Sequence, residues 1–260
     1  MLTSKGKFHI FEGQGTPIAI IKDSKSKKTP VLSVDDKETA KTSYDDIKLT
    51  GEEKFQIIPN PETERQIFYI TGRSGSGKSY FTLNYCIEYR KMFPKREVYL
   101  FSALTEDKTL DKFKGLKRIK LTDEFCSEEF TAQDFKDSLV LFDDTDVISD
   151  KRIRNKVNAL MDNILQIGRH SNTSCIFCSH SACNGMQTKI ILNEAHSITL
   201  FPIGLGNRSI KYLLDSYLGL DKAQCKRIRS LKTRSVTIMK TFPMTILTEK
   251  EAYIIKPNDD

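Results

Sequence analysis

Residues 72–79 read Gly-Arg-Ser-Gly-Ser-Gly-Lys-Ser and lie just behind an apolar stretch, Ile67-Phe68-Tyr69-Ile70. They match the pattern G-x-x-x-x-G-K-[ST], which cradles nucleotide phosphates when a strand precedes it and a helix follows. The residues that follow, up to Met92, place aromatic side chains along one side of a helix. Strand, glycine loop and helix are therefore predicted in the order that phosphate binding requires, and a chance glycine-rich turn is disfavoured.

Each part of this phosphate loop has a chemical role. Glycines let backbone N–H groups turn toward phosphate oxygens, and the helix N-terminus adds partial positive charge. Lys78 is expected to reach the outer phosphates, and the Ser79 hydroxyl to ligate magnesium, so the predicted cofactors are ATP and Mg²⁺. The predicted nucleotide-contacting residues are Gly72, Arg73, Ser74, Gly75, Ser76, Gly77, Lys78, Ser79 and Tyr80.

A second motif predicts hydrolysis. Residues 139–144 read Leu-Val-Leu-Phe-Asp-Asp, an apolar run typical of a buried parallel strand that ends in two carboxylates. The carboxyl end of such a strand is where a doubly wound sheet presents catalytic groups. Asp143 is expected to hold magnesium through water, opposite Ser79, and Asp144 to orient the attacking water as a base. The alternative is an acid-rich turn without a role, since Asp146 follows closely.

Composition limits the classes of protein to which the chain can belong. The 260 residues carry a formal net charge of +7, which fits either a polyanionic partner or simply a basic surface. No apolar run is long enough for a membrane span, and the first residues lack the apolar core of a signal peptide. The six cysteines are scattered. We therefore expect a reducing, intracellular setting.

The order of elements predicts an α/β protein with two sections. Two short strands are expected at 7–11 and 17–21, followed by a polar linker, so that residues 1–54 precede the core. From 55 to 260, strands and helices alternate in the manner of a parallel sheet, with a long helix over 150–168. Its apolar stripe is Ile153, Val157, Leu160, Ile164 and Ile167. Two further helices (207–218 and 221–231) and two strands (235–239 and 245–248, the last extending toward 255) form a C-terminal extension.

Smaller features leave alternatives open. Strand alternation sends Cys175 and Cys178 to opposite faces, which favours core cysteines over a shared metal site. His180 ends that strand and is either a γ-phosphate sensor or a surface histidine. Arg169 either contacts phosphate, in its own or a neighbouring subunit, or only complements a helix C-terminus. The basic stretch that ends at Arg234 is either a phosphate-contacting surface, an arginine finger included, or the solvated face of a helix.

These residues also resemble a family. The order of IFYITGRSGSGKSYF (67–81), LVLFDDTD (139–146), IGRHSNTSCIFCSH (167–180) and YLGLDKAQCKRIRSLKTRSVTIMK (217–240) is similar to the poxvirus-type virion DNA-packaging ATPases of large nucleocytoplasmic DNA viruses and virophages. These proteins belong to the FtsK-HerA superfamily of P-loop ATPases, and the similarity covers about residues 55–255.

The resemblance implies a RecA-like three-layer sandwich around a mainly parallel sheet. It also implies an ATPase that translocates double-stranded DNA as a homo-oligomeric ring and packages a viral genome. A capsid vertex or portal protein would be a partner. The setting would be the host cytoplasm, at the site of viral assembly, or the virion.

The family's site residues fall on Lys78 and Ser79, on the pair Asp143 and Asp144, and on His180 at the sensor position. An arginine from the next subunit, Arg169 or Arg234 here, would complete each site. The chain departs from the family in three places. The sensor is His instead of Gln, the second acid is Asp instead of the Glu common in the superfamily, and Ser235 follows Arg234 where an aromatic residue is frequent.

Two other function classes compete with a DNA motor. One is a phosphotransferase, such as a nucleotide or polynucleotide kinase, although the paired acids argue against it. The other is a nucleotide-gated interaction protein that hydrolyses slowly. ATP turnover without an acceptor, stimulated by duplex DNA, separates the motor from both.

Overall fold

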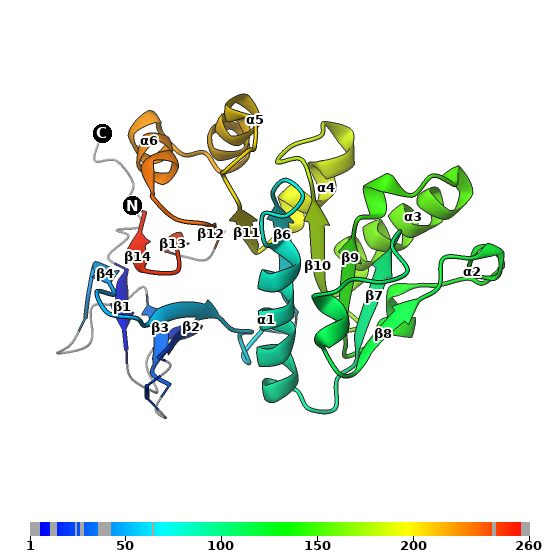
Figure 1. Ribbon diagram of the computed structural model, residues 1–260, viewed down its shortest axis with the longest axis horizontal. Coiled ribbons are helices and arrows are strands. Elements are labelled where there is room, and N and C mark those ends of the chain that lie inside the picture. Colours follow the sequence, from blue (N-terminus) through cyan, green and yellow to red (C-terminus); the bar gives the residue numbers. More distant parts are fainter. Residues whose placement is uncertain are drawn as a thin grey trace.

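The computed structural model describes residues 6–10, 15–23, 25–26, 29–35, 43–63, 65–240 and 243–255. It contains two sheets (Figure 1). The small sheet is antiparallel throughout and has the order β1-β3-β2-β5. Its strands are β1 (Lys7–His9), β2 (Thr16–Lys22), β3 (Val31–Asp35) and β5 (Lys54–Ile57).

The large sheet has ten strands and a parallel centre. In spatial order they are β4 (Asp46–Lys48), β14 (Glu251–Ile254), β13 (Thr245–Leu247), β12 (Val236–Met239), β11 (Ser197–Leu200), β6 (Ile67–Thr71), β10 (Ser174–Ser179), β9 (Leu139–Asp143), β7 (Val98–Ser102) and β8 (Leu116–Ile119). Pairing is parallel from β11 to β8 and antiparallel from β11 to β4. The phosphate-loop strand β6 and the acid-bearing strand β9 are thus separated by β10 alone.

Helices cover both faces of this sheet. The α-helices are α1 (Lys78–Met92), α2 (Asp123–Ser127), α3 (Lys151–Ile167), α4 (Met186–Glu194), α5 (Asn207–Tyr212) and α6 (Lys222–Ser230). Short 3₁₀ turns lie at Leu110–Lys112, Ala132–Phe135 and Thr145–Val147, and a π-helical turn at Leu213–Tyr217. The core on one face joins the strands to α1 and the small sheet, and the core on the other joins them to α3, α4 and the C-terminal helices.

Strand alternation explains these two cores. In β9, Val140 and Phe142 pack toward α3, whereas Leu139 and Leu141 pack toward α1. Because both faces are covered, the strand is apolar at every position before Asp143. The result is the predicted α/β P-loop fold, a three-layer sandwich around a mainly parallel sheet, and that prediction is confirmed.

Several local predictions differ from the structure. The polar linker at 22–54 contains β3 and β4, and β4 pairs with β14 of the large sheet. The end of the first expected strand, Phe11, lies outside the described residues. Ile167 of the predicted stripe is 49 % exposed, while Met161 and Leu165 are buried instead. The division of the chain at residue 54 stays a prediction.

Other elements differ in extent. The segment predicted as one helix over 207–218 divides into α5 and the π-helical turn, and the last strand divides into β13 and β14. Helix α4 was not predicted. Within the part of the chain that the structure describes, no helix has the length and apolarity needed to cross a membrane.

Candidate functional site

The phosphate loop connects β6 to α1 and is fixed at its start. The backbone N–H of Gly72 donates to the carbonyl oxygen of Ser179 at 3.1 Å, which ties the loop to the end of β10. A Cβ on Gly72 would lie 2.6 Å from Cβ of Phe201, so a side chain has no room there. Gly75 and Gly77 have φ values of +70° and +114°, which side-chain-bearing residues rarely adopt. These backbone conformations explain why the loop is rich in glycine.

Lys78 lies inside this loop. Its side chain is buried, and Nζ donates to the carbonyl oxygen of Gly72 at 2.8 Å. The Ser76 hydroxyl of the loop is buried and has no hydrogen-bond partner among the described residues. Buried polar groups are normally paired, so an unpaired hydroxyl at a loop of this sequence fits a phosphate oxygen as its missing partner. The residues present therefore fit the nucleotide that the motif predicts.

Asp143 ends β9 and is 4 % exposed. Burial raises the pKa of its carboxyl to about 6, and the neighbouring Asp144 charge adds to the rise, while Lys78 opposes it. Because a buried carboxylate is costly to ionise, a nearby cation stabilises its ionised form strongly. Asp143 and the Ser79 hydroxyl near the start of α1 are the predicted magnesium ligands, and carboxylate and hydroxyl oxygens suit that ion.

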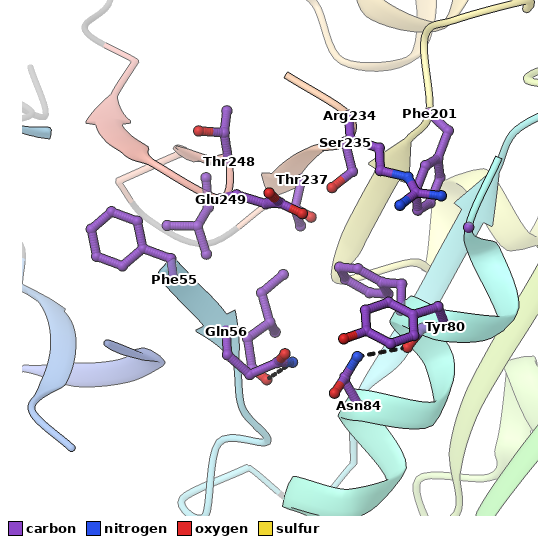
Figure 2. Close-up of a pocket in the computed structure, with 14 residues that line it drawn as sticks. Phe55, Gln56, Tyr80, Asn84, Phe201, Arg234, Ser235, Thr237, Thr248 and Glu249 are labelled. Carbon is purple, nitrogen blue, oxygen red and sulfur yellow. Dashed lines mark hydrogen bonds between the residues drawn. The ribbon is translucent and has the colours of Figure 1, made fainter. Parts of the chain in front are cut away.

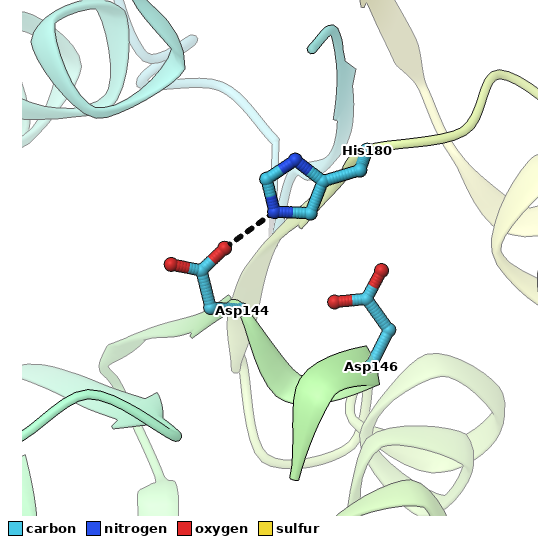
Figure 3. A group of neighbouring side chains, drawn as sticks. All are labelled: Asp144, Asp146 and His180. Atoms are coloured by element: carbon cyan, nitrogen blue, oxygen red, sulfur yellow. Dashed lines mark hydrogen bonds and ion pairs between the residues drawn. The ribbon is translucent and has the colours of Figure 1, made fainter. Parts of the chain in front are cut away.

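Asp144 leaves the strand in a left-handed conformation, with φ of +53°. Its Oδ1 lies 2.7 Å from Nε2 of His180 (Figure 3). Nδ1 of the same imidazole lies 3.3 Å from Nζ of Lys78. His180 follows β10, the strand between β6 and β9. The imidazole therefore bridges the phosphate loop and the second acid, which is where a sensor of the γ-phosphate is expected.

The same acidic turn brings Asp146 near. Ligand atoms of Asp144, Asp146 and His180 all lie within 4.8 Å of one another (Figure 3). These are donor types that bind divalent cations. However, the imidazole also faces the Lys78 ammonium, and that positive charge disfavours a cation on the ring. The geometry thus favours the paired histidine over a second metal site.

The predicted arginines lie in three different places. Arg234 is beside its own phosphate loop, where Nε donates to the carbonyl oxygen of Ser76 at 3.0 Å. Arg73 packs over Gly204, in the connection between β11 and α5. Arg169 follows the C-terminus of α3, whose 17 residues span about 25 Å away from the acidic turn. Of the two candidate fingers, Arg234 is near its own site and Arg169 is far from it.

The cysteine prediction agrees with the structure. Cys175 and Cys178 are both buried and belong to the two cores on opposite faces of the sheet. Sequence reasoning did not foresee that the turn between β13 and β14, with Glu249, and strand β5, with Gln56, approach the N-terminal turn of α1. These segments lie far apart in the sequence, and no local pattern marks them.

Comparisons with known proteins give a relative in sequence and solved structures of similar fold. No protein-family model matches the chain. It is 41 % identical over 207 residues to the uncharacterized protein V3 of Sputnik virophage, covering 78 % of this chain and 82 % of V3.

Two solved structures are similar in fold. One is B204, the DNA-packaging ATPase of Sulfolobus turreted icosahedral virus, with a TM-score of 0.52 and 17 % identity over 72 % of this chain and 98 % of B204. The other is the genome-packaging NTPase B204 of Sulfolobus turreted icosahedral virus 2 in complex with ATPγS, with a TM-score of 0.50 and 16 % identity over the same shares.

The buried charge of Asp143 gives a stability prediction. Asp143→Asn removes a carboxyl group that is ionised in the folded chain above about pH 6, where its raised pKa means that the ionised form destabilises the fold. Without magnesium, we expect the free energy of unfolding at pH 7.5 to rise by about 1–2 kcal/mol. The gain should shrink as the pH falls through 6, because the native carboxyl is then protonated.

Urea unfolding at pH 7.5 and pH 5 measures this difference. Asp146→Asn is the matched control, because Asp146 lies in the same turn and is exposed. Equal stability of Asp143→Asn and the native chain at pH 7.5 would contradict the prediction.

Proposed function

The chain belongs to the family of the Sputnik virophage protein V3 and has the fold of viral genome-packaging ATPases, and on this premise we propose that it is an ATP-hydrolysing motor that translocates double-stranded DNA into a viral capsid. The observation that carries the proposal is the chain of contacts from Lys78 through His180 to Asp144. It joins the phosphate-binding loop to a second acid, a combination suited to hydrolysis by water.

We propose the following roles in the reaction. Lys78 and the loop N–H groups hold the outer phosphates, and Asp144 accepts a proton from the attacking water. The water oxygen forms a bond to the γ-phosphorus while the bond from that phosphorus to the β–γ bridging oxygen breaks, giving ADP and phosphate. Mg²⁺ held by Ser79 and Asp143 would neutralise charge on the phosphates. His180, in contact with both Lys78 and Asp144, is positioned to sense the γ-phosphate.

We further propose that the motor is a ring of identical subunits with a trans-acting arginine. Arg234 is engaged by its own phosphate loop, which favours a role within its own subunit. Arg169 is exposed and lies beyond the far end of α3. In a head-to-tail ring, a surface remote from its own site faces a neighbour, so Arg169 is the better candidate for the trans role. A capsid vertex or portal protein is the proposed further partner, in the host cytoplasm or the virion.

The proposed DNA contact uses the basic C-terminal stretch only in part. Arg227 stacks on the Tyr253 ring at 3.6 Å and pairs with Asp46, so it supports the fold. Lys226 and Lys232 are exposed and remain available to phosphates. A duplex contact made by such lysines is electrostatic and independent of base sequence.

The first prediction separates binding from hydrolysis. Lys78→Ala should abolish tight ATP binding, because it removes the charge that meets the outer phosphates. Asp144→Asn should bind ATP as the native chain does but lose at least about 100-fold in turnover, because the amide cannot accept the proton. Steady-state phosphate release without any acceptor, together with calorimetric ATP binding, measures both.

Asp146→Asn is the control for this pair, since it removes a nearby acid that is not assigned a role. If Asp144→Asn hydrolyses ATP at the native rate, Asp144 is not the base. Turnover that requires an acceptor molecule would instead favour a phosphotransferase.

The second prediction concerns the arginines. Arg169→Ala and Lys78→Ala should each be nearly inactive alone, because an arginine finger contributes about 10³–10⁵ in rate. Mixed one to one, they should recover activity, since about a quarter of the sites in randomly mixed rings combine an intact loop with an intact neighbour. ATPase rates of mixtures, after subunit exchange is verified, give the measurement.

Arg234→Ala provides the matched comparison. If Arg234 acts within its own subunit, its mixture with Lys78→Ala contains no repaired site and should stay inactive. If activity recovers in the mixture with Arg234→Ala but not in the mixture with Arg169→Ala, then Arg234 acts in trans and Arg169 does not.

The third prediction concerns DNA. Lys226→Ala and Lys232→Ala should weaken duplex binding equally for all base sequences and lower the log-log salt slope by about one each. Fluorescence anisotropy with duplexes of unrelated sequence, over a range of salt concentrations, measures this. Lys108→Ala, on the β7 side of the sheet, is the control. Binding that does not respond to salt would point to a different partner.

A further inference from the structure

A cavity lies beside the N-terminal turn of α1, on the side of the phosphate loop away from Asp143. Its walls come from β5, α1, the β11–β12 segment and the turn between β13 and β14 (Figure 2). The lining residues used below are Gln56, Tyr80, Phe81, Phe201, Arg234 and Glu249. Four segments that are distant in sequence thus meet at one hollow next to the predicted phosphate site.

The walls of this cavity suit a flat, partly polar ring. The Phe81 and Phe201 rings meet edge to face at 6.3 Å between centroids. Tyr80 is 62 % exposed and offers an aromatic face at the opening. The amide of Gln56 and the carboxylate of Glu249 supply hydrogen-bonding groups (Figure 2). Apolar and aromatic walls with a few polar groups are typical of small-molecule sites.

The cavity is continuous with the phosphate loop. Gly77, which precedes α1, lines it, and so does Arg234, whose Nε donates to the carbonyl oxygen of Ser76. The other side of the loop is occupied by His180 and by Asp143 and Asp144 at the end of β9. A nucleotide whose outer phosphates face those acids must extend its sugar and base away from them, toward this cavity.

The Glu249 carboxylate defines what the cavity can recognise. Its Oε2 accepts from Nζ of Lys54 at 3.1 Å, and among the described residues Oε1 has no partner. An ionised carboxylate only accepts hydrogen bonds, so it favours a ring that carries an N–H donor. Adenine and guanine both present an exocyclic amino group, whereas unsubstituted purine has neither an amino group nor an N–H on its six-membered ring.

We propose that this cavity holds the base of the bound nucleoside triphosphate and that Glu249 selects purines that carry an amino group. The inference rests on the proposed function. It adds recognition of the nucleotide base, which the phosphate loop does not recognise. It also gives the small sheet a role in the site. The N–H of Phe55 in β5 donates to the carbonyl oxygen of Glu249 at 2.9 Å, so the edge of that sheet holds Glu249 in place.

The test compares ligands with and without the base. Calorimetry measures binding of ATP, GTP, purine riboside triphosphate and inorganic tripolyphosphate to the full chain. Variants are Glu249→Gln and Tyr80→Ala, with Glu97→Gln as the control. Glu97 matches Glu249 closely, because both side chains are 41 % exposed and paired with a lysine.

The native chain should bind ATP or GTP about tenfold more tightly than purine riboside triphosphate. Glu249→Gln should remove most of that preference, and Tyr80→Ala should weaken all three nucleotides. Neither should change tripolyphosphate binding, and Glu97→Gln should change nothing.

Unchanged ATP and GTP affinity in Glu249→Gln would overturn the inference. So would an equal loss of tripolyphosphate affinity in that variant, because it would mean general damage to the fold. If tripolyphosphate binds as tightly as ATP and GTP to the native chain, only the base site fails. If none of the four ligands binds, the proposed function fails with it.

Discussion

The contact between His180 and its two charged neighbours is the interaction on which the site depends. An imidazole between the Lys78 ammonium and the Asp144 carboxylate joins two motifs that are more than sixty residues apart. This is possible only because β10 lies between β6 and β9, with Ser179 paired to Thr71 and Phe177 to Phe142. Strand order and register therefore bring three side chains to one point at the carboxyl edge of the sheet, where an open α/β fold places its chemistry.

That arrangement has a cost in stability. Asp143 is almost fully buried next to a second acid. The raised pKa of its carboxyl reflects the free-energy cost of ionising it there. A chain selected only for stability would place an apolar or neutral residue there. The apolar β9 around it and the two covered faces of the sheet supply the burial that offsets this cost.

The fold and the motifs were predictable where the signal is local. The apolar runs of β6, β9 and β10 and the glycine pattern of the loop each lie within one short segment, so their bounds follow from the sequence. Strand β4 was missed because it has a single buried residue, Ile47, among polar neighbours. Ile167 fits the helical period, but α3 ends there and the side chain lies outside the core. The cavity wall at Glu249 depends on pairings across more than 190 residues, which no periodicity encodes.

The left-handed conformation of Asp144 bears on the residue types at positions 144 and 180. Aspartate adopts φ near +53° with less strain than longer side chains, which restricts replacement at that position. Its short side chain still reaches a partner because His180 extends a ring toward it. With glutamine at 180 and glutamate at 144, the two side chains would span different shares of the distance between their backbones. The side-chain lengths at the two positions are therefore linked through one contact, so a change of length at either position changes what the other must span.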